Sequence, residues 1–179
     1  MRRHFALTAV GRDRPGIVAG VTRVLLQAGC NIEDSSMTIL RTEFAMILIL
    51  KGPGELEAAA LEKDLSAAVS GVAFFVKELA PEEVHVARTV GQSYIVSVYG
   101  ADRPGIVHGV ARALAERGVN ITDLNTRLVG PEDKPVYVMI LEADVPPDVP
   151  GDELEAELKR AANELGVELS LRPLETHAL

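Results

Sequence analysis

The residues best suited to bind a small molecule lie in one segment that the chain carries twice. The segment runs from Gly11 to Asp34 and again from Gly100 to Asp123, with a constant offset of 89 residues and 15 of 24 positions identical. Each copy reads Asp-Arg-Pro-Gly-Ile-Val, followed some 15 residues later by Asn-Ile. A repeat of this length and quality indicates two copies of one module.

The first half of the segment has the composition of a strand end, a tight turn and a helix start. Pro15 and Pro104 suit the first helical turn, where a missing N–H costs nothing. The free N–H groups and partial positive charge of a helix N-terminus suit a carboxylate or a phosphate. Gly16 and Gly105 lack a side chain where such a ligand would approach the backbone.

The second half of the segment places Asn31 and Asn120 after the helix, where the next strand starts. An amide side chain can both donate and accept hydrogen bonds, as recognition of an α-amino acid requires. We expect these residues at the same end of the fold as a neighbouring domain's turn. The alternative is that the segment only builds a good turn, with Asp13 and Asp102 accepting from the free amides of the first helical turn.

Composition excludes several classes of function. The formal net charge of −8 and the pI of about 5.0 repel phosphate backbones, so no direct nucleic-acid partner is expected. The longest apolar run, 44–50, is far too short to span a membrane, and the N-terminus lacks a signal-peptide pattern. Cys30, whose counterpart is Val119, excludes an intramolecular disulfide and predicts a small buried apolar role. A cytoplasmic protein is expected.

The apolar pattern predicts the same order of elements in both halves. The first half has expected strands at 4–10, 32–40, 44–50 and 72–79, a helix between Pro15 and Gly29, and a second helix at 55–70. The second half has expected strands at 93–99, 136–141 and 167–171, a strand through 124–128, a helix between Pro104 and Gly118, and another at 152–165. An insertion, 130–135, lengthens its hairpin.

This order, strand-helix-strand-strand-helix-strand, predicts an α+β fold made of two ferredoxin-like βαββαβ domains. Each domain has a four-stranded antiparallel sheet with two helices on one face. The expected domains are 1–80 and 92–179, joined by a linker at 81–91. The third strand of each half is apolar at every position, which predicts that the other half or a second chain covers the open sheet face.

The repeated Asp-Arg-Pro-Gly-Ile-Val with its later Asn-Ile resembles the ACT domain, a small-molecule-sensing module. Two such segments in a chain of this length resemble the glycine cleavage system transcriptional repressor family. The resemblance implies an amino acid, such as glycine or serine, bound at an interface between two domains. It also implies regulation through a protein partner, a transcription activator, rather than through DNA.

The resemblance implies two sets of ligand-binding residues, one in each copy. They are Asp13, Arg14, Pro15, Gly16, Ile17, Asn31 and Ile32 in the first copy, and Asp102, Arg103, Pro104, Gly105, Ile106, Asn120 and Ile121 in the second. The copies differ at Ala101, which stands in place of Arg12, and at Thr122, which stands in place of Glu33. These departures and the inserted hairpin predict that the two sites need not be equivalent.

An enzyme is the first alternative, and the sequence gives it little support. The four histidines, His4, His85, His108 and His177, show no metal-ligand spacing and do not recur between the copies. We therefore predict no catalytic residue, no metal site and no cofactor. The second alternative is a homodimeric interaction module without a ligand, or a regulator of a metabolic enzyme. A homo-oligomer is expected both for an amino-acid-binding protein and for an interaction module without a ligand.

Overall fold

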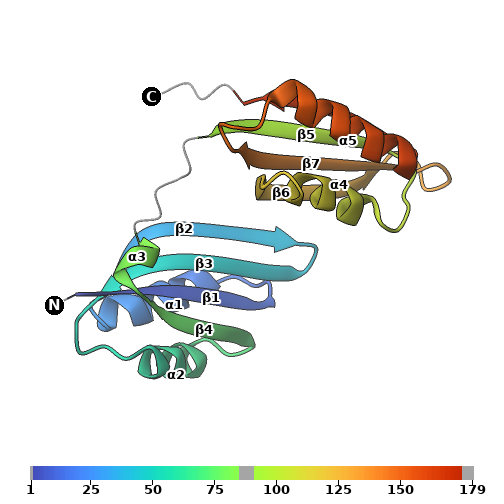
Figure 1. Cartoon of the computed structure of the whole chain (residues 1–179). Coiled ribbons are helices and arrows are strands. Elements are labelled where there is room, and N and C mark those ends of the chain that lie inside the picture. The colour runs from blue at the N-terminus through green and yellow to red at the C-terminus, as the bar shows by residue number, and fades with distance from the viewer. Residues whose placement is uncertain (1, 85–90, 175–179) are drawn as a thin grey trace. The chain divides into compact units, whose positions relative to one another are not determined.

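The computed structural model of the protein describes residues 2–84 and 91–174 (Figure 1). The chain divides into two compact units, Met1–Val86 and Ala87–Leu179. The linker expected at 81–91 stays a prediction, because residues 85–90 lie outside the described part of the chain. His85 and His177 also lie outside it, as do the last five residues of the expected second domain.

The first unit contains a four-stranded sheet with two helices on one of its faces (Figure 1). Its elements are β1 (Arg3–Arg12), α1 (Ile17–Gln27), β2 (Asn31–Leu40), β3 (Glu43–Gly52), α2 (Ala58–Ala68) and β4 (Val72–Leu79). The strands lie in the order β2-β3-β1-β4, and each neighbouring pair is antiparallel. A short helix, α3 (Pro81–Val84), follows within the expected linker.

The second unit repeats this architecture. Its elements are β5 (Gln92–Gly100), α4 (Ile106–Ala115), β6 (Asn120–Val129), β7 (Val136–Val145), α5 (Gly151–Leu165) and β8 (Val167–Pro173). The strands lie in the order β6-β7-β5-β8, again with antiparallel neighbours. The predicted fold class, two ferredoxin-like βαββαβ domains with two helices on one face of each sheet, is confirmed.

The core of each unit lies between the sheet and its helices. In β1, Phe5, Leu7 and Ala9 are fully buried, while the residues between them lie on the opposite face, as the two-residue period of a strand requires. The helix residues that complete this core recur every three or four positions: Ile17, Val21, Val24 and Leu25 in α1, and Leu61 and Leu65 in α2. Within the described ranges no polar or charged residue is buried.

A glycine in the first helix of each unit allows the two helices to pack closely. A Cβ added at Gly20 would lie 2.8 Å from Cγ2 of Val69, and one added at Gly109 would lie 2.8 Å from Cδ1 of Leu165. Both distances are shorter than van der Waals contact. The missing side chains therefore set how closely the helices approach each other.

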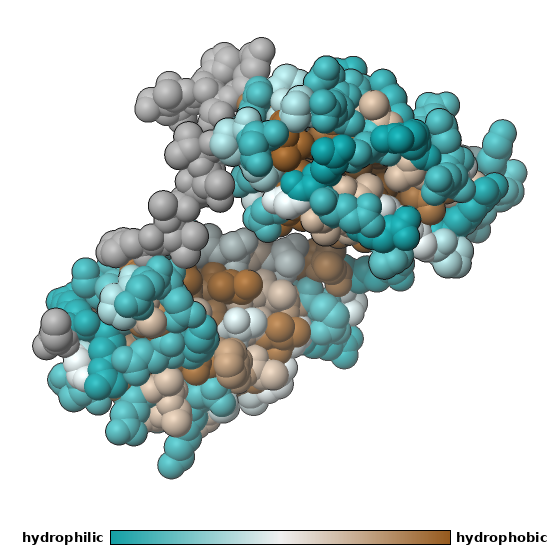
Figure 2. Space-filling view, viewed as in Figure 1, coloured by the Kyte–Doolittle hydropathy of each residue, from teal (hydrophilic) through white to brown (hydrophobic). Residues whose placement is uncertain are grey.

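The opposite face of each sheet is open within its own unit and carries large apolar side chains. In the first unit Val10, Ile47 and Phe75 are 46%, 53% and 61% exposed. Figure 2 shows hydrophobic surface over this unit's sheet as brown patches. In the second unit Tyr99 and Ile140 are equivalent to Val10 and Ile47, whereas Ser170 stands in place of Phe75. Val136 is a further exposed apolar residue of β7. The expected cover of this face stays a prediction.

The observed elements differ from the expected ones mainly at their ends. β7 extends to Val145 because Ala143 and Val145 continue the buried alternation past the last position of the apolar run. α2 begins at Ala58 rather than 55, since the amide of Leu56 donates to the carbonyl of Pro53 (3.2 Å) and forms a turn first. No helix between residues 2 and 84 or between 91 and 174 has the length and hydropathy needed to cross a membrane.

Candidate functional site

The turn between the first strand and first helix of each unit depends on one glycine. Gly16 and Gly105 adopt φ values of +94° and +98°, in the left-handed region that favours glycine, and each immediately precedes its helix. A Cβ at either position would meet no atom within 4 Å. The glycines therefore shape the turn and leave open space beside the first N–H groups of the helix.

The predicted cap by the aspartates is wrong. Neither α1 nor α4 has a side-chain cap, since the left-handed glycine itself occupies the capping position. The backbone amide of Asp13 instead donates to the carbonyl of Thr42 (2.8 Å), which ties the turn to the hairpin between β2 and β3. The side chains of Asp13 and Asp102 remain exposed beside the turn.

The arginine of each turn reaches the loop that follows the second helix. Nη2 of Arg14 donates to the carbonyl oxygen of Ser70 at 2.7 Å. In the second unit Arg103 lies against Gly166, where an added Cβ would come within 2.9 Å of its Nη1. Both arginines therefore have a visible structural contact, and their expected role in ligand binding stays a prediction.

The remaining turn residues differ in what they can offer a ligand. Ile17 and Ile106 are only 2% exposed, so their side chains belong to the two cores and only their backbone groups face the turn. Pro15 and Pro104 are exposed. A ligand at the turn can therefore contact the backbone and the exposed aspartate, arginine and proline, but not the isoleucine side chain.

The asparagines lie at the other end of each sheet. Asn31 is the first residue of β2 and pairs with Lys51, which in turn pairs with His4 near the start of β1. The turn follows the far end of β1, about 30 Å away at the usual rise per strand residue. The same distance separates Asn120 from the turn of the second unit, because its register is equivalent. A single unit thus does not bring its two predicted half-sites together.

A hollow lies beside the asparagine end of the first unit. It has a volume of about 530 Å³ and lies between the exposed side of α1 and the start of β2. Asn31 and Ile32 line it together with Thr22, Arg23 and Leu26. Ile32 is 38% exposed, so its apolar side chain is accessible at this end of the unit.

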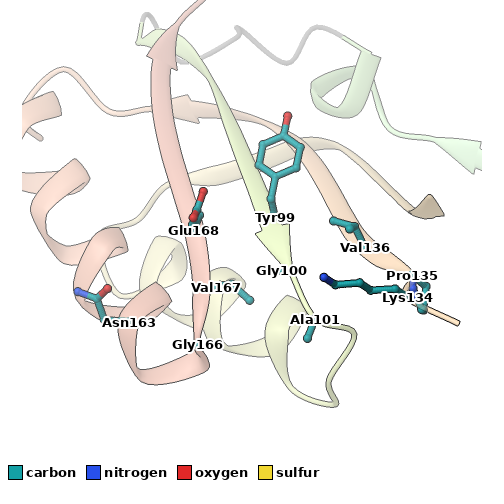
Figure 3. Close-up of a pocket in the computed structure, with 10 residues that line it drawn as sticks. All are labelled: Tyr99, Gly100, Ala101, Lys134, Pro135, Val136, Asn163, Gly166, Val167 and Glu168. Atoms are coloured by element: carbon teal, nitrogen blue, oxygen red, sulfur yellow. The ribbon is translucent and has the colours of Figure 1, made fainter. Parts of the chain in front are cut away.

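A second hollow, of about 560 Å³, lies at the turn end of the second unit (Figure 3). It lies between the end of β5 at 99–101, the inserted loop at 134–136 and the start of β8 at 166–168. In Figure 3 the amine of Lys134 points toward Gly100, while Tyr99 and Glu168 project from the same side of the sheet. The insertion therefore changes the surroundings of the turn in this unit.

The sequence hypothesis missed a group of ionisable residues beside Asn31. Oε2 of Glu33 lies 3.1 Å from Nε2 of His4, and its Oε1 lies 3.5 Å from Nζ of Lys51. Glu33 is the extra residue of a β-bulge, where the pairing of β2 with β3 shifts between Ile32 and Asp34. Only the strand register brings the three residues together, so their spacing in the sequence carries no signal.

Other reactive groups of the described residues are isolated. No group of three or more His, Cys, Asp or Glu within 2–84 and 91–174 is arranged to hold a metal ion. His108 is exposed on α4. Cys30 packs partly buried against the first core, and this burial raises the pKa of its thiol, in agreement with the predicted apolar role.

Comparison with known proteins agrees with this architecture. The ACT domain family matches residues 3–74 and again residues 94–161. The glycine cleavage system transcriptional repressor of Escherichia coli (strain K12) is 47% identical over 51 residues, which are 28% of this chain and 27% of that protein. The match thus spans about a quarter of the length of this curated relative.

Two solved structures are similar over nearly the whole chain. A crystal structure of an unknown protein from Galdieria sulphuraria has a TM-score of 0.83 at 26% identity, covering 98% of this chain and 100% of that one. That of a "putative glycine cleavage system transcriptional repressor" has a TM-score of 0.68 at 25% identity, covering 98% and 99%. With two matched domains, each of the observed βαββαβ fold, the chain belongs to the ACT domain family.

Proposed function

We propose that the protein is a regulatory amino-acid-binding protein whose ligand lies between the turn of one ACT module and the strand start of another. The observation that carries the proposal is the placement of the two repeated motifs at opposite ends of each unit, both exposed. One module cannot enclose a small molecule with both motifs. Two modules related by a rotation can, and this supports the expected homo-oligomer.

The chemistry of the two half-sites supports an α-amino acid. The turn presents backbone N–H groups at a helix N-terminus, with open space at Gly16 and Gly105, and this environment favours the ligand's carboxylate. The amides of Asn31 and Asn120 can accept from an ammonium group and donate to a carboxylate. ACT domains in general bind amino acids and mediate regulation.

The signal would pass to another protein through a shift in population. A ligand that binds one arrangement of the modules more tightly increases its population, and the partner recognises that arrangement. Similarity to a transcriptional repressor supports a transcription regulator of amino-acid or one-carbon metabolism as the partner. The net charge of −8 disfavours a direct contact with DNA.

The first test is thermal unfolding of the whole chain in the presence of each of the twenty amino acids, followed by calorimetric titration of any that bind. A ligand at 100 times its dissociation constant adds about 2.7 kcal/mol to the free energy of unfolding. We expect a selective shift with glycine or serine. Unchanged transitions with all twenty amino acids would contradict the proposal.

The asparagines provide the matching variants. Asn31→Ala and Asn120→Ala each remove a hydrogen bond to a charged group, worth about 1.5–3 kcal/mol, so affinity should fall roughly 10- to 100-fold at the altered site. Both side chains are exposed, so the fold should persist. Gln27→Ala, which removes another exposed amide at the end of α1, is the control. If both asparagine variants bind the ligand with wild-type affinity, Asn31 and Asn120 do not contribute to ligand binding.

A second candidate function is an interaction module that binds no small molecule, either as a homodimer or as the regulator of a metabolic enzyme. The exposed apolar side chains Val10, Ile47 and Phe75 on the open face favour a protein contact there. Ile47→Lys should then reduce the mass measured by light scattering from dimer to monomer. A rise in the unfolding temperature with any of the twenty amino acids would favour the amino-acid-binding protein over this interaction module.

A further inference from the structure

A row of polar side chains crosses the open face of the first sheet at the end where Asn31 lies. The antiparallel register places His4 opposite Lys51, and Lys51 opposite Asn31, so the three residues share one face. Glu33 bridges two members of the row, 3.1 Å from the His4 imidazole and 3.5 Å from the Lys51 ammonium. Asn31 thus has a carboxylate and an ammonium group beside it.

The second sheet has the same row with different chemistry. Ser93, Asp144 and Asn120 occupy the equivalent positions of β5, β7 and β6. Oγ of Ser93 donates to Oδ1 of Asp144 at 2.7 Å, and the bulge residue is Thr122 in place of a glutamate. The row contains a carboxylate but no cation. In the next row Asp123 pairs with Glu142, and the one cation of that row, Arg172, lies on the far side of Ile95.

We infer that the two rows give the two proposed amino-acid sites different specificities. The Asn31 row recognises both charges of a zwitterion, and the Asn120 row recognises only the ammonium group. This inference rests on the proposed function, since it concerns the same two sites. Lys51 and Asp144 are its specificity-determining residues.

The physical basis is charge complementarity. At the Asn31 row, Glu33 can accept from the ligand's ammonium group and Lys51 can donate to its carboxylate, and such charge-assisted bonds are about twice as strong as neutral ones. An ammonium group has three donors, and the 3.5 Å contact with Glu33 leaves donors of Lys51 available. The Lys51 and Glu33 side chains are 37% and 32% exposed, so a ligand can reach them.

At the Asn120 row a ligand carboxylate gains no cation and meets the charge of Asp144. Like charges at short range repel, while the ammonium group of the same ligand is attracted. The contribution of this row to binding therefore comes from the ammonium group alone. Because the turn of another module binds the carboxylate at both sites, replacing the carboxylate by a neutral amide should cost less affinity here than at the Asn31 row, where the contact with Lys51 is also lost.

The experiment is calorimetric titration of the full chain with glycine and L-serine, with glycinamide and serinamide, which lack the carboxylate, and with the N-acetyl derivatives, which lack the ammonium group. If another amino acid gives the thermal shift, its own derivatives replace these. The variants are Lys51→Met and Asp144→Asn. Lys63→Met, which removes an exposed lysine from α2, is the control.

For the wild type we expect the amino acid to bind both sites, the amide to lose at least tenfold more affinity at one site than at the other, and the N-acetyl derivative to bind both sites more weakly than the amino acid. Lys51→Met should weaken one of the two amino-acid sites at least tenfold and leave the tighter amide site unchanged. Asp144→Asn should weaken the tighter amide site and leave amino-acid binding at the Lys51 site unchanged.

The inference and the proposed function fail in different ways. Amino-acid binding by the Lys51→Met and Asp144→Asn variants that equals that of the wild type overturns the inference and leaves the proposed function intact. Equal loss of amide and amino-acid binding in Lys51→Met also overturns it, because both rows would then depend on one residue. A wild-type chain that binds none of the twenty amino acids overturns both.

Discussion

The two units have the same backbone and differ where a ligand would bind. Their strand orders, their left-handed glycines and their asparagine-containing strand starts correspond position by position. The first unit has a histidine, a lysine and a glutamate beside its asparagine, where the second has a serine, an aspartate and a threonine. The Asp-Arg-Pro-Gly turn is identical in the two copies and the core stays apolar in both, while the ionisable residues near the proposed ligand differ.

The stabilities of the two units can be measured separately if the units unfold independently. All three tyrosines, Tyr94, Tyr99 and Tyr137, lie in the second unit, and the chain has no tryptophan, so tyrosine fluorescence reports on that unit alone. Circular dichroism reports on both. The chain thus carries its own probe for separating the stability of one unit from that of the other.

The largest expected effect comes from a matched pair of core substitutions. Leu65 and Leu158 occupy equivalent positions in α2 and α5, and both are fully buried. Leu→Ala at either position should cost about 2–5 kcal/mol of unfolding free energy, through lost transfer energy and a residual cavity. The midpoint of urea denaturation measured by tyrosine fluorescence should fall for Leu158→Ala and stay unchanged for Leu65→Ala. For Leu65→Ala only the transition measured by circular dichroism should shift. A fluorescence shift of similar size in both variants would show that the units unfold together.

A smaller effect is expected where the helices approach each other. Gly20→Ala places a Cβ 2.8 Å from a Val69 methyl group, and Gly109→Ala places one 2.8 Å from a Leu165 methyl group. Valine has one rotatable bond to relieve the overlap, whereas leucine has two. Overpacking costs about 1–3 kcal/mol, and the helix gains about 1 kcal/mol from alanine.

We therefore expect Gly20→Ala to destabilise the first unit by up to about 2 kcal/mol and Gly109→Ala to be nearly neutral, measured by the same denaturation curves. Double variants with Val69→Ala and Leu165→Ala are the controls, because removal of the opposing methyl groups should relieve any overlap. A larger loss from Gly109→Ala than from Gly20→Ala would contradict the argument.

The sequence predicts the existence and type of twelve elements because the repeat supplies each pattern twice. It does not predict where these elements begin and end when the hydrogen bonds of the adjoining turn set the boundary. The predicted helix cap by Asp13 is wrong, because Gly16 already occupies the capping position in a left-handed backbone conformation. The sequence pattern does not reveal that conformation. The polar row beside Asn31 could not be predicted either, because His4 and Lys51 become neighbours only through strand register and a bulge. The ligand-binding residues themselves stay predictions.

The smallest expected effect concerns an ion pair that the first unit lacks. Arg117, whose counterpart is Ala28, donates from Nε to Oε2 of Glu157 at 2.7 Å and so joins the end of α4 to α5. The hydrogen bond from Arg117 lowers the pKa of the Glu157 carboxyl below its ordinary value of 4.5. A carboxyl with a lowered folded-state pKa contributes stability above its unfolded-state pKa and loses it as pH falls through the folded-state value.

Arg117→Met should therefore reduce the stability of the second unit slightly at pH 7 and have no effect in acid well below pH 4.5. The measurement is the tyrosine-detected unfolding midpoint of the wild type and the variant across this pH range. Arg112→Met, which removes an exposed arginine of α4 with a weaker 3.8 Å contact to Glu116, is the matched control. A difference between wild type and Arg117→Met that stays constant from pH 7 into acid would show that the side chain acts by packing along α5 rather than by its charge.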